Sequence, residues 1–270
     1  MGIIFGLGEA FFWVGYNFDF TKFSDTKNRM QEVKVWFVLV SAIGIAGPLI
    51  GGFLLSYLSF YIVFVVVILL FILSIFPLLH LKKWNIGYKV KVKNIFRREN
   101  FDNSPRYFLQ GLRHLVGGIF WPIFIFYFVK EYFSLGAIIA GATLFSSFAI
   151  WVIGDHVNRF NRKLLTDFGG MVHGVISFIK VFISSFGQLF FVAVASHITY
   201  GVTEIAVNSL SYDQANKTKS MEFFIFREFM LSIGRVSLLV IILFSGLSLI
   251  SSLKLGFIIL GATSLLQRFF

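Results

Sequence analysis

The sequence predicts an all-α, polytopic integral membrane protein, and three observations lead to that prediction. Of its 270 residues, 57% are hydrophobic and only 14% are charged, whereas about 25% of the residues of a soluble domain are charged. The mean hydropathy is +0.82. The apolar residues form continuous runs of about 20 residues, which is the length that a helix needs to cross a bilayer. The basic residues gather in polar passages between these runs.

Continuous apolar runs favour helices over a β-barrel, because barrel strands alternate apolar and polar residues in short segments. The chain contains about nine runs of suitable length. We therefore expect about nine transmembrane helices, near residues 1–16, 35–55, 60–81, 107–129, 135–154, 164–186, 188–211, 223–245 and 251–270.

The longest polar passage, residues 82–106, divides these runs into two groups. It holds eight of the 24 lysines and arginines of the chain. We expect a first helical group in residues 1–81, a basic linker in residues 82–106 and a six-helix group in residues 107–270.

The positions of the basic residues predict the orientation in the membrane. If alternate loops lie on the same side, 19 of the 24 basic residues fall on one side and two on the other, with three inside spans. Loops rich in lysine and arginine stay in the cytoplasm. We therefore expect a plasma-membrane protein whose linker and C-terminus are cytoplasmic and whose first helix begins outside. The lipid bilayer then accounts for the net charge of +11, and a nucleic-acid partner is not expected.

Charged and titratable residues inside predicted spans are candidates for a substrate or proton pathway, because each charge is costly at the centre of a bilayer. The candidates are Glu9, Arg113, His114, Glu204 and Arg235. Arg235 lies roughly 16 Å into its span, and Glu204 lies roughly 10 Å from the cytoplasmic end of its own. These depths predict a pair between Glu204 and Arg235. The alternative is a structural ion pair or a buried, protonated glutamate.

Other polar residues have simpler interpretations. Lys180 lies about two turns from the outer end of its span, from where its side chain is expected to reach the membrane surface. Asp213, Arg227 and Glu228 are expected to form a cytoplasmic charge network. The chain has no cysteine, and its histidines lack the spacing of a metal site. No nucleophile, metal or nucleotide motif appears, so we expect neither a metal nor a cofactor, and no enzyme.

Short patterns recur between the two halves of the chain. Three pairs occur in the same order, at offsets of 190 to 195 residues: Gly6-x-x-Glu9 with Gly201-x-x-Glu204, Lys27-x-Arg29-x-x-Glu32 with Lys217-x-Lys219-x-x-Glu222, and Ile43-Gly44 with Ile233-Gly234. The paired helices run in the same predicted direction, which indicates two parallel repeats. In this scheme the fourth, fifth and sixth predicted helices have no counterpart in the first repeat, and their counterparts would be three missing helices.

Two motifs make the chain resemble the major facilitator superfamily of secondary transporters. Residues 154–163 resemble the loop signature G-x-x-x-D-R-x-G-R-[RK] through Gly154, Asp155, Asn158, Arg159, Arg162 and Lys163, although Asn158 and Asn161 replace its aspartate and second glycine. Residues 44–52 resemble the antiporter motif G-P-x-x-G-G of the family's fifth helix through Gly44, Gly47, Pro48, Gly51 and Gly52.

This resemblance implies a twelve-helix fold of which the chain contains helices 4 to 12, with the first three missing. It implies secondary active transport of a small solute by alternating access. We expect proton coupling and a weak preference for efflux, with residues 154–163 latching the inner gate and residues 44–52 allowing a helix to bend. The alternative is a truncated, non-transporting sensor or scaffold with the same fold. Asn158 favours this alternative, and the charges inside the spans count against it.

Overall fold

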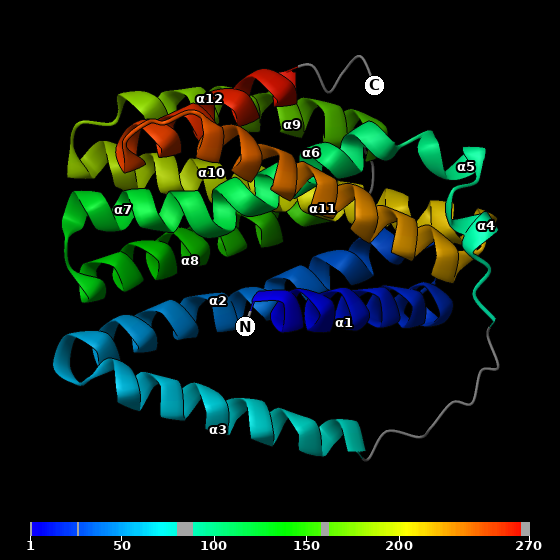
Figure 1. The fold of residues 1–270 in the computed structure, drawn as a ribbon, viewed down its shortest axis with the longest axis horizontal. Coiled ribbons are helices and arrows are strands. Elements are labelled where there is room, and N and C mark those ends of the chain that lie inside the picture. The colour runs from blue at the N-terminus through cyan, green and yellow to red at the C-terminus, as the bar shows by residue number, and fades with distance from the viewer. Residues whose placement is uncertain (1, 26, 80–88, 158–161, 266–270) are drawn as a thin grey trace.

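The structure, a computed structural model, describes residues 2–25, 27–79, 89–157 and 162–265, and this part of the chain is helical with no strand (Figure 1). The all-α prediction is therefore confirmed for these residues. The helices are α1 (Gly2–Phe23), α2 (Arg29–Tyr57), α3 (Phe60–Leu79), α4 (Val92–Ile95), α5 (Arg98–Phe101), α6 (Ser104–Leu115), α7 (Trp121–Val129), α8 (Tyr132–Val157), α9 (Arg162–Ile179), α10 (Phe186–Lys217), α11 (Ser220–Phe244) and α12 (Leu249–Leu265).

Six helical segments in the described part are long and apolar enough to cross a membrane. They are α2, α3, α6 with α7, α8, α9 and α10. Helices α1, α11 and α12 occupy the other three predicted places but are not among these six segments, and α12 is a shorter apolar helix. The chain thus has several candidate spans, and the number nine stays a prediction.

Helices α6 and α7 form one continuous rod, joined by a π-helical turn at residues 116–120. Two features of the sequence explain this wider turn. Gly117 and Gly118 are weak helix formers, and Pro122 has no N–H to donate to the preceding turn. Single π turns of this kind are accommodated within α-helices.

Helix α10 lies at the centre of the second helical group and packs against α8, α9 and α11. Its first turn is fixed by a capping box. The Ser185 hydroxyl accepts from the Gln188 N–H at 3.3 Å, and the Gln188 side chain accepts from the Ser185 N–H at the same distance. This reciprocal cap satisfies backbone donors that a helix start leaves unpaired.

The main hydrophobic core lies inside the second group, between α6–α7, α8, α10, α11 and α12. Trp121, Phe124 and Phe257 form a ring cluster in it, with centroids 5.4 to 5.9 Å apart. A second core joins α1 and α2 to α10 and α11, through residues such as Val33 and Phe224. The two predicted helical groups therefore share a packed interface.

The glycine motif of α2 takes part in this interface. A Cβ at Gly52 would lie 2.6 Å from the Tyr132 carbonyl oxygen, and one at Gly136 of α8 would collide with the Pro48 carbonyl oxygen. Small residues at such positions let two helices approach closely. Gly44 has only ordinary contact with Thr143, while Gly47 and Gly51 face open space. Helix α2 continues through Pro48.

Helix α3 diverges from the other helices (Figure 1). No residue of its most apolar window is buried. Near its start the Phe60 ring lies 5.8 Å from the Tyr132 ring, and its main packing partner is α2. An apolar helix with so little of its surface covered by protein suits a lipid environment.

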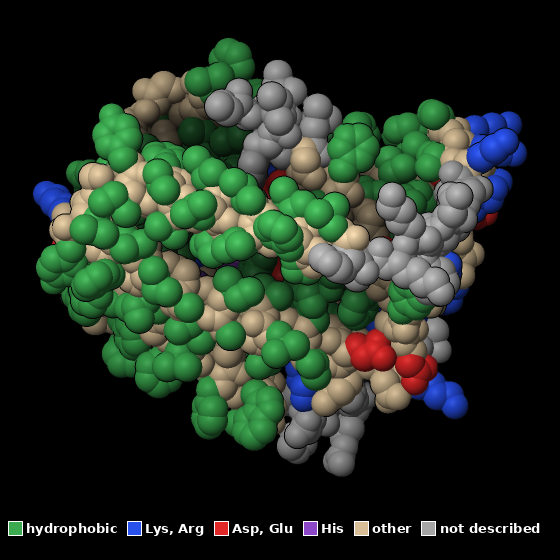
Figure 2. Space-filling view, turned by 90° about the horizontal axis from the view of Figure 1, so that it is seen from below, with side chains coloured by type: hydrophobic (Ala, Val, Ile, Leu, Met, Phe, Trp, Pro, Cys, Tyr) green, Lys and Arg blue, Asp and Glu red, His purple; other side chains and the backbone are tan. Residues whose placement is uncertain are grey.

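The charged side chains gather at one end of the molecule. Helices α4 and α5 lie at this end, and the α2–α3, α7–α8, α9–α10 and α11–α12 turns lie at the opposite end (Figure 1). In the view of Figure 2, hydrophobic side chains cover most of the surface and most of the basic ones lie at the α4–α5 end. We call this end, with residues 25, 27–29, 92–106 and 213–222, the basic end.

The loop motif at residues 154–163 falls mainly outside the described residues. Gly154 and Asp155 belong to the last turns of α8, and Arg162 and Lys163 begin α9. Asn158 and Arg159 lie outside the described part. The expected latch therefore stays a prediction.

Candidate functional site

The candidate site forms where α6 crosses α11 beside α10. Two glycines permit this crossing: a Cβ at Gly111 would collide with the Leu231 carbonyl oxygen, and one at Gly234 would collide with the Phe108 carbonyl oxygen. The close approach places the polar residues that follow each glycine in contact. Sequence reasoning singled out Gly234 only as part of a repeat.

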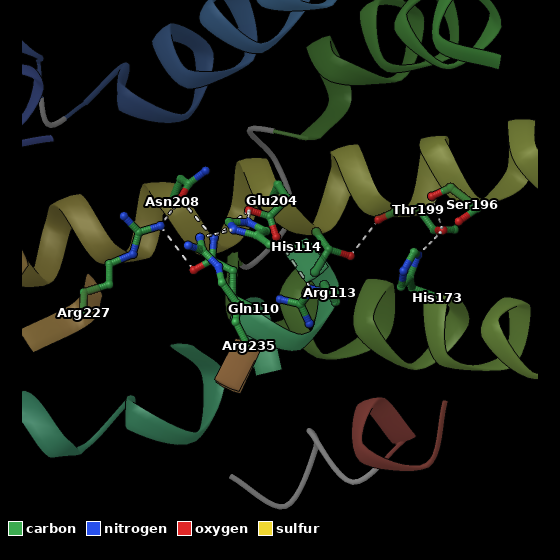
Figure 3. Close-up of polar contacts among 11 residues, drawn as sticks. Gln110, Arg113, His114, His173, Ser196, Thr199, Glu204, Asn208, Arg227 and Arg235 are labelled. Atoms are coloured by element: carbon green, nitrogen blue, oxygen red, sulfur yellow. Dashed lines mark hydrogen bonds and ion pairs between the residues drawn. The ribbon is translucent and has the colours of Figure 1, made fainter. Parts of the chain in front are cut away.

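Glu204 is the centre of the polar cluster that results (Figure 3). Its Oε2 accepts from Gln110 Nε2 at 2.6 Å and lies 3.3 Å from His114 Nε2. Its Oε1 lies 3.6 Å from Arg113 Nε. Glu204 is 4% exposed and Arg113 is fully buried. The buried carboxylate thus has a hydrogen-bond donor in Gln110 and an ion-pair partner in Arg113.

His114 links Glu204 to Arg235. Arg235 Nη2 lies 3.2 Å from His114 Nδ1, and a guanidinium can only donate a hydrogen bond. Nδ1 is therefore the acceptor, and the proton of the neutral imidazole lies on Nε2, which donates to Glu204. Glu204 and Arg235 are thus not paired directly, as predicted, but are connected through His114, which contacts both.

Gln110 and Asn208 extend the cluster toward the basic end, and sequence reasoning did not find them. Arg227 Nη2 donates to Asn208 Oδ1 at 2.5 Å and to Gln110 Oε1 at 3.2 Å. Its guanidinium also lies 5.8 Å from the centroid of the Tyr107 ring. Uncharged amides inside apolar runs give a weaker sequence signal, because burying a neutral polar group costs less than burying a charge.

On the other side of Glu204, a line of polar residues continues inside the second group. The Tyr200 ring lies between the rings of His114 and His173, with centroids 6.3 Å from each. His173 Nδ1 lies 3.0 Å from the Thr199 hydroxyl, which donates to the Ala195 carbonyl and therefore accepts from His173. The buried His173 of α9 therefore lies beyond Tyr200, in contact with Thr199 (Figure 3).

Lys180 does not reach the surface, and the prediction that it does is wrong. Its side chain is 1% exposed, and Nζ lies 4.5 Å from the Trp121 ring centroid and 5.7 Å from that of Phe257. Attraction between the ammonium group and the aromatic faces stabilises this position. The short 3₁₀ turn at residues 180–182 directs the side chain inward.

The expected charge network of Asp213, Arg227 and Glu228 is divided in the structure. Asp213 lies at the basic end, where Arg29 Nη1 of α2 donates to its Oδ1 at 2.8 Å. Arg227 instead belongs to the Gln110 and Asn208 contacts. Glu228 is half-buried, and among the described contacts no hydrogen bond or ion pair joins it to Asp213 or Arg227.

Glu9 lies apart from the other pathway candidates. It is exposed on α1 and does not contact the described residues of the Glu204 cluster, whereas Arg113, His114 and Arg235 all belong to it. A different contact ties α1 to α10: the Tyr212 hydroxyl donates to Asn17 Oδ1 at 2.8 Å. In the described part of the chain no three carboxylate or histidine side chains come together as metal ligands would.

Comparison with known proteins gives a distant relative of the chain. Over an alignment of 253 residues it is 24% identical to the Bacillus subtilis (strain 168) protein YqgE, whose name describes it as uncharacterized. The alignment covers 87% of this chain and 58% of YqgE, so the chain spans about three fifths of that relative's length. No protein-family profile and no solved structure matches the chain.

Proposed function

We propose that the chain is a secondary active transporter of the major facilitator type, which moves a small solute by alternating access, coupled to protons, with a weak preference for efflux. The observation that carries this proposal is the buried cluster around Glu204. Charged groups inside a membrane protein are costly unless they serve a pathway or pair with one another. This cluster lies near the middle of α10, a helix long and apolar enough to span a membrane.

His114 is the group that we propose binds the coupling proton. Glu204 contacts Gln110, Arg113 and His114, whereas His114 has one ring nitrogen that accepts from Arg235. Histidine exchanges its proton in the physiological pH range. A proton on Nδ1 would place two donors face to face and would break the contact with Arg235. Proton binding is thereby coupled to the contact between α6 and α11.

The groups that face His114 support this assignment. Glu204 and Tyr200 face it from α10, Arg235 from α11 and His173 from α9 beyond Tyr200, while Arg113 precedes it on α6. The carboxylate stabilises a protonated imidazole, and the two guanidinium groups oppose it. Binding of a ligand at either arginine would therefore change the contacts of His114.

Contacts at the basic end would form the closed gate of such a transporter. In the proposed orientation this end is cytoplasmic, because basic loops stay inside. The ion pair between Arg29 and Asp213 and the hydrogen bond between Asn17 and Tyr212 join the two helical groups there. Opening toward the cytoplasm would require that both contacts separate.

The test is proton flux in proteoliposomes that contain a trapped pH-sensitive dye. Succinate, inorganic phosphate, glucose and choline are added outside in turn. We expect at least one solute to drive proton movement, and we expect Glu204→Gln and His114→Gln to reduce it at least tenfold. Glu99→Gln, which changes an exposed carboxylate in the same way, serves as the matched control and should retain the flux.

Two outcomes would contradict the proposal in different ways. Flux that is unchanged in both site variants would exclude the cluster as the coupling site. No flux with any of the four solutes in the wild-type chain would favour a non-transporting sensor or scaffold, for which Asn158 in the loop motif is the supporting observation.

A further inference from the structure

The Glu204 cluster contains more positive than negative charge. Three arginines meet there, Arg113, Arg227 and Arg235, and Glu204 is the carboxylate that they surround. Arg113 and Arg227 are buried, and Arg235 is half-buried. Because burying an unpaired charge costs several kcal/mol, the excess positive charge needs an explanation.

The contacts show which cations lack a negative partner. Arg113 pairs with Glu204. Arg227 contacts only the neutral oxygens of Gln110 and Asn208 and the face of a tyrosine ring. Arg235 contacts only the neutral His114. Two guanidinium groups among the described residues are therefore solvated by uncharged groups alone.

Acidic side chains elsewhere on the surrounding helices are engaged at other places. Asp213 pairs with Arg29, Glu222 accepts from the Lys91 backbone and from Asn94, and Asp167 faces Arg106. The described part of the chain thus supplies no second carboxylate to this cluster.

Arg235 has the features of a binding group. Its Nε and Nη1 have no acceptor among the described residues, and only Nη2 is engaged, with His114. Arg235 and His114 are also the partly exposed members of the charged cluster, with 28% of the His114 side chain exposed. A planar guanidinium with two free donors matches the two oxygens of a carboxylate or phosphate group.

We propose that this cluster binds a small anion, a carboxylate or a phosphate, with Arg235 as its principal ligand. The anion pairs with the free donors of Arg235, and Arg227 and Arg113 provide the surrounding positive field. This inference rests on the proposed function, for which it names the substrate class. It also explains why Arg235 contacts the neutral His114 and not a carboxylate. An anion that binds Arg235 then has to displace only a weak hydrogen-bond acceptor.

The experiment measures thermal unfolding of the purified full chain in nanodiscs by tryptophan fluorescence, with succinate, inorganic phosphate, glucose or choline added. We expect succinate or phosphate to raise Tm, and glucose and choline to leave it unchanged. The anion that gives the larger rise identifies the preferred headgroup. Arg235→Gln should weaken binding of that anion at least tenfold, and Arg235→Lys should retain part of it.

A matched control separates the site from general anion attraction. Arg97→Gln removes the same charge from an exposed position at the basic end and should keep the full rise in Tm. In the absence of anion, Arg235→Gln should unfold at or above the wild-type temperature, because it removes a cation that lacks a negative partner. A lower Tm for this variant would assign Arg235 a structural role and would overturn the proposal.

The remaining outcomes distinguish the two proposals from each other. A rise in Tm with neither anion, or an equal rise in Arg235→Gln, would overturn the anion site. Anion binding that depends on Arg235, without solute-driven proton flux in liposomes, would leave the anion site standing and would contradict transport. Flux driven by glucose or choline alone would support transport and contradict the anion site.

Discussion

The Cβ that a side chain at Gly234 would require lies 3.4 Å from the Cα of Gly111. The two glycines thus form the contact at which α6 and α11 cross, and this contact sets the position of the whole Glu204 cluster. His114 follows Gly111 by three residues and Arg235 follows Gly234 by one. The spacing of the two helices therefore determines whether His114 and Arg235 can touch.

Substituting Gly234 by alanine is expected to separate these helices. The new methyl group would collide with the Phe108 carbonyl oxygen, which is backbone and cannot rotate away. Overpacking of this kind costs about 1–3 kcal/mol. We expect a lower Tm and, in the liposome assay, reduced proton coupling.

The control is Gly47→Ala in the middle of α2, where a Cβ meets no atom within 4 Å. There the gain in helix propensity, about 0.5–1 kcal/mol, should leave stability unchanged or increased. Equal destabilisation by both variants would contradict the prediction that the α6–α11 contact requires glycine at residue 234.

Glu204→Gln tests the electrostatic role of the carboxylate. Glutamine keeps an acceptor for Gln110 but removes the charge that balances Arg113, which is fully buried. Breaking a buried ion pair by removing one partner typically costs about 3–5 kcal/mol. We expect a large decrease in the free energy of unfolding, measured by denaturant titration in detergent. A change below about 1 kcal/mol, similar to that of the exposed Glu99→Gln, would contradict the described pairing.

Much of the fold follows from hydropathy. Apolar runs such as residues 60–81 have the length of a span, and the structure contains a helix in each of the nine predicted places. Lys180 shows the limit of this reasoning. Its distance from the helix end predicted an exposed ammonium group, but the 3₁₀ turn and the Trp121 and Phe257 rings, which are distant in sequence, give it a buried position.

The candidate site was predictable in its charged members but not in its connections. Glu204, Arg113, His114 and Arg235 stand out because charged and titratable residues are rare in apolar runs. Their pairing depends on the helix crossing at Gly111, which no local pattern reveals. Depth along a helix placed Glu204 and Arg235 at similar levels, but it could not show that His114 lies between them.

The ion pair between Arg29 and Asp213 should stabilise the contact between α2 and α10. Arg29 is fully buried and the Asp213 side chain is 30% exposed, so the pair is only partly screened by solvent. We expect a double-mutant cycle with Arg29→Gln and Asp213→Asn to give a coupling energy within the range of about 0.5–3 kcal/mol. The measurement is denaturant unfolding of the four proteins.

The pair Arg106–Asp167 is the matched control for this gate, because it joins α6 and α9 within the second helical group at 3.5 Å. Breaking either pair can lower stability. Only loss of the Arg29–Asp213 pair should increase the reactivity of a cysteine introduced at Val33, a buried position between the two groups. Equal reactivity in Asp213→Asn and Asp167→Asn would remove the reason to regard the first pair as a gate.

The orientation of the chain can be tested directly, because the protein contains no cysteine and any cysteine introduced is unique. We expect Ser59→Cys and Ser248→Cys, at exposed turns of the end opposite to the basic end, to react with a membrane-impermeant maleimide in intact cells. Arg97→Cys and Lys219→Cys, at exposed positions of the basic end, should react only after the membrane is permeabilised. The physical reason is the concentration of lysine and arginine at that end, which keeps it in the cytoplasm. The reverse labelling pattern would invert the proposed topology, and labelling of all four positions in intact cells would contradict a membrane-spanning arrangement.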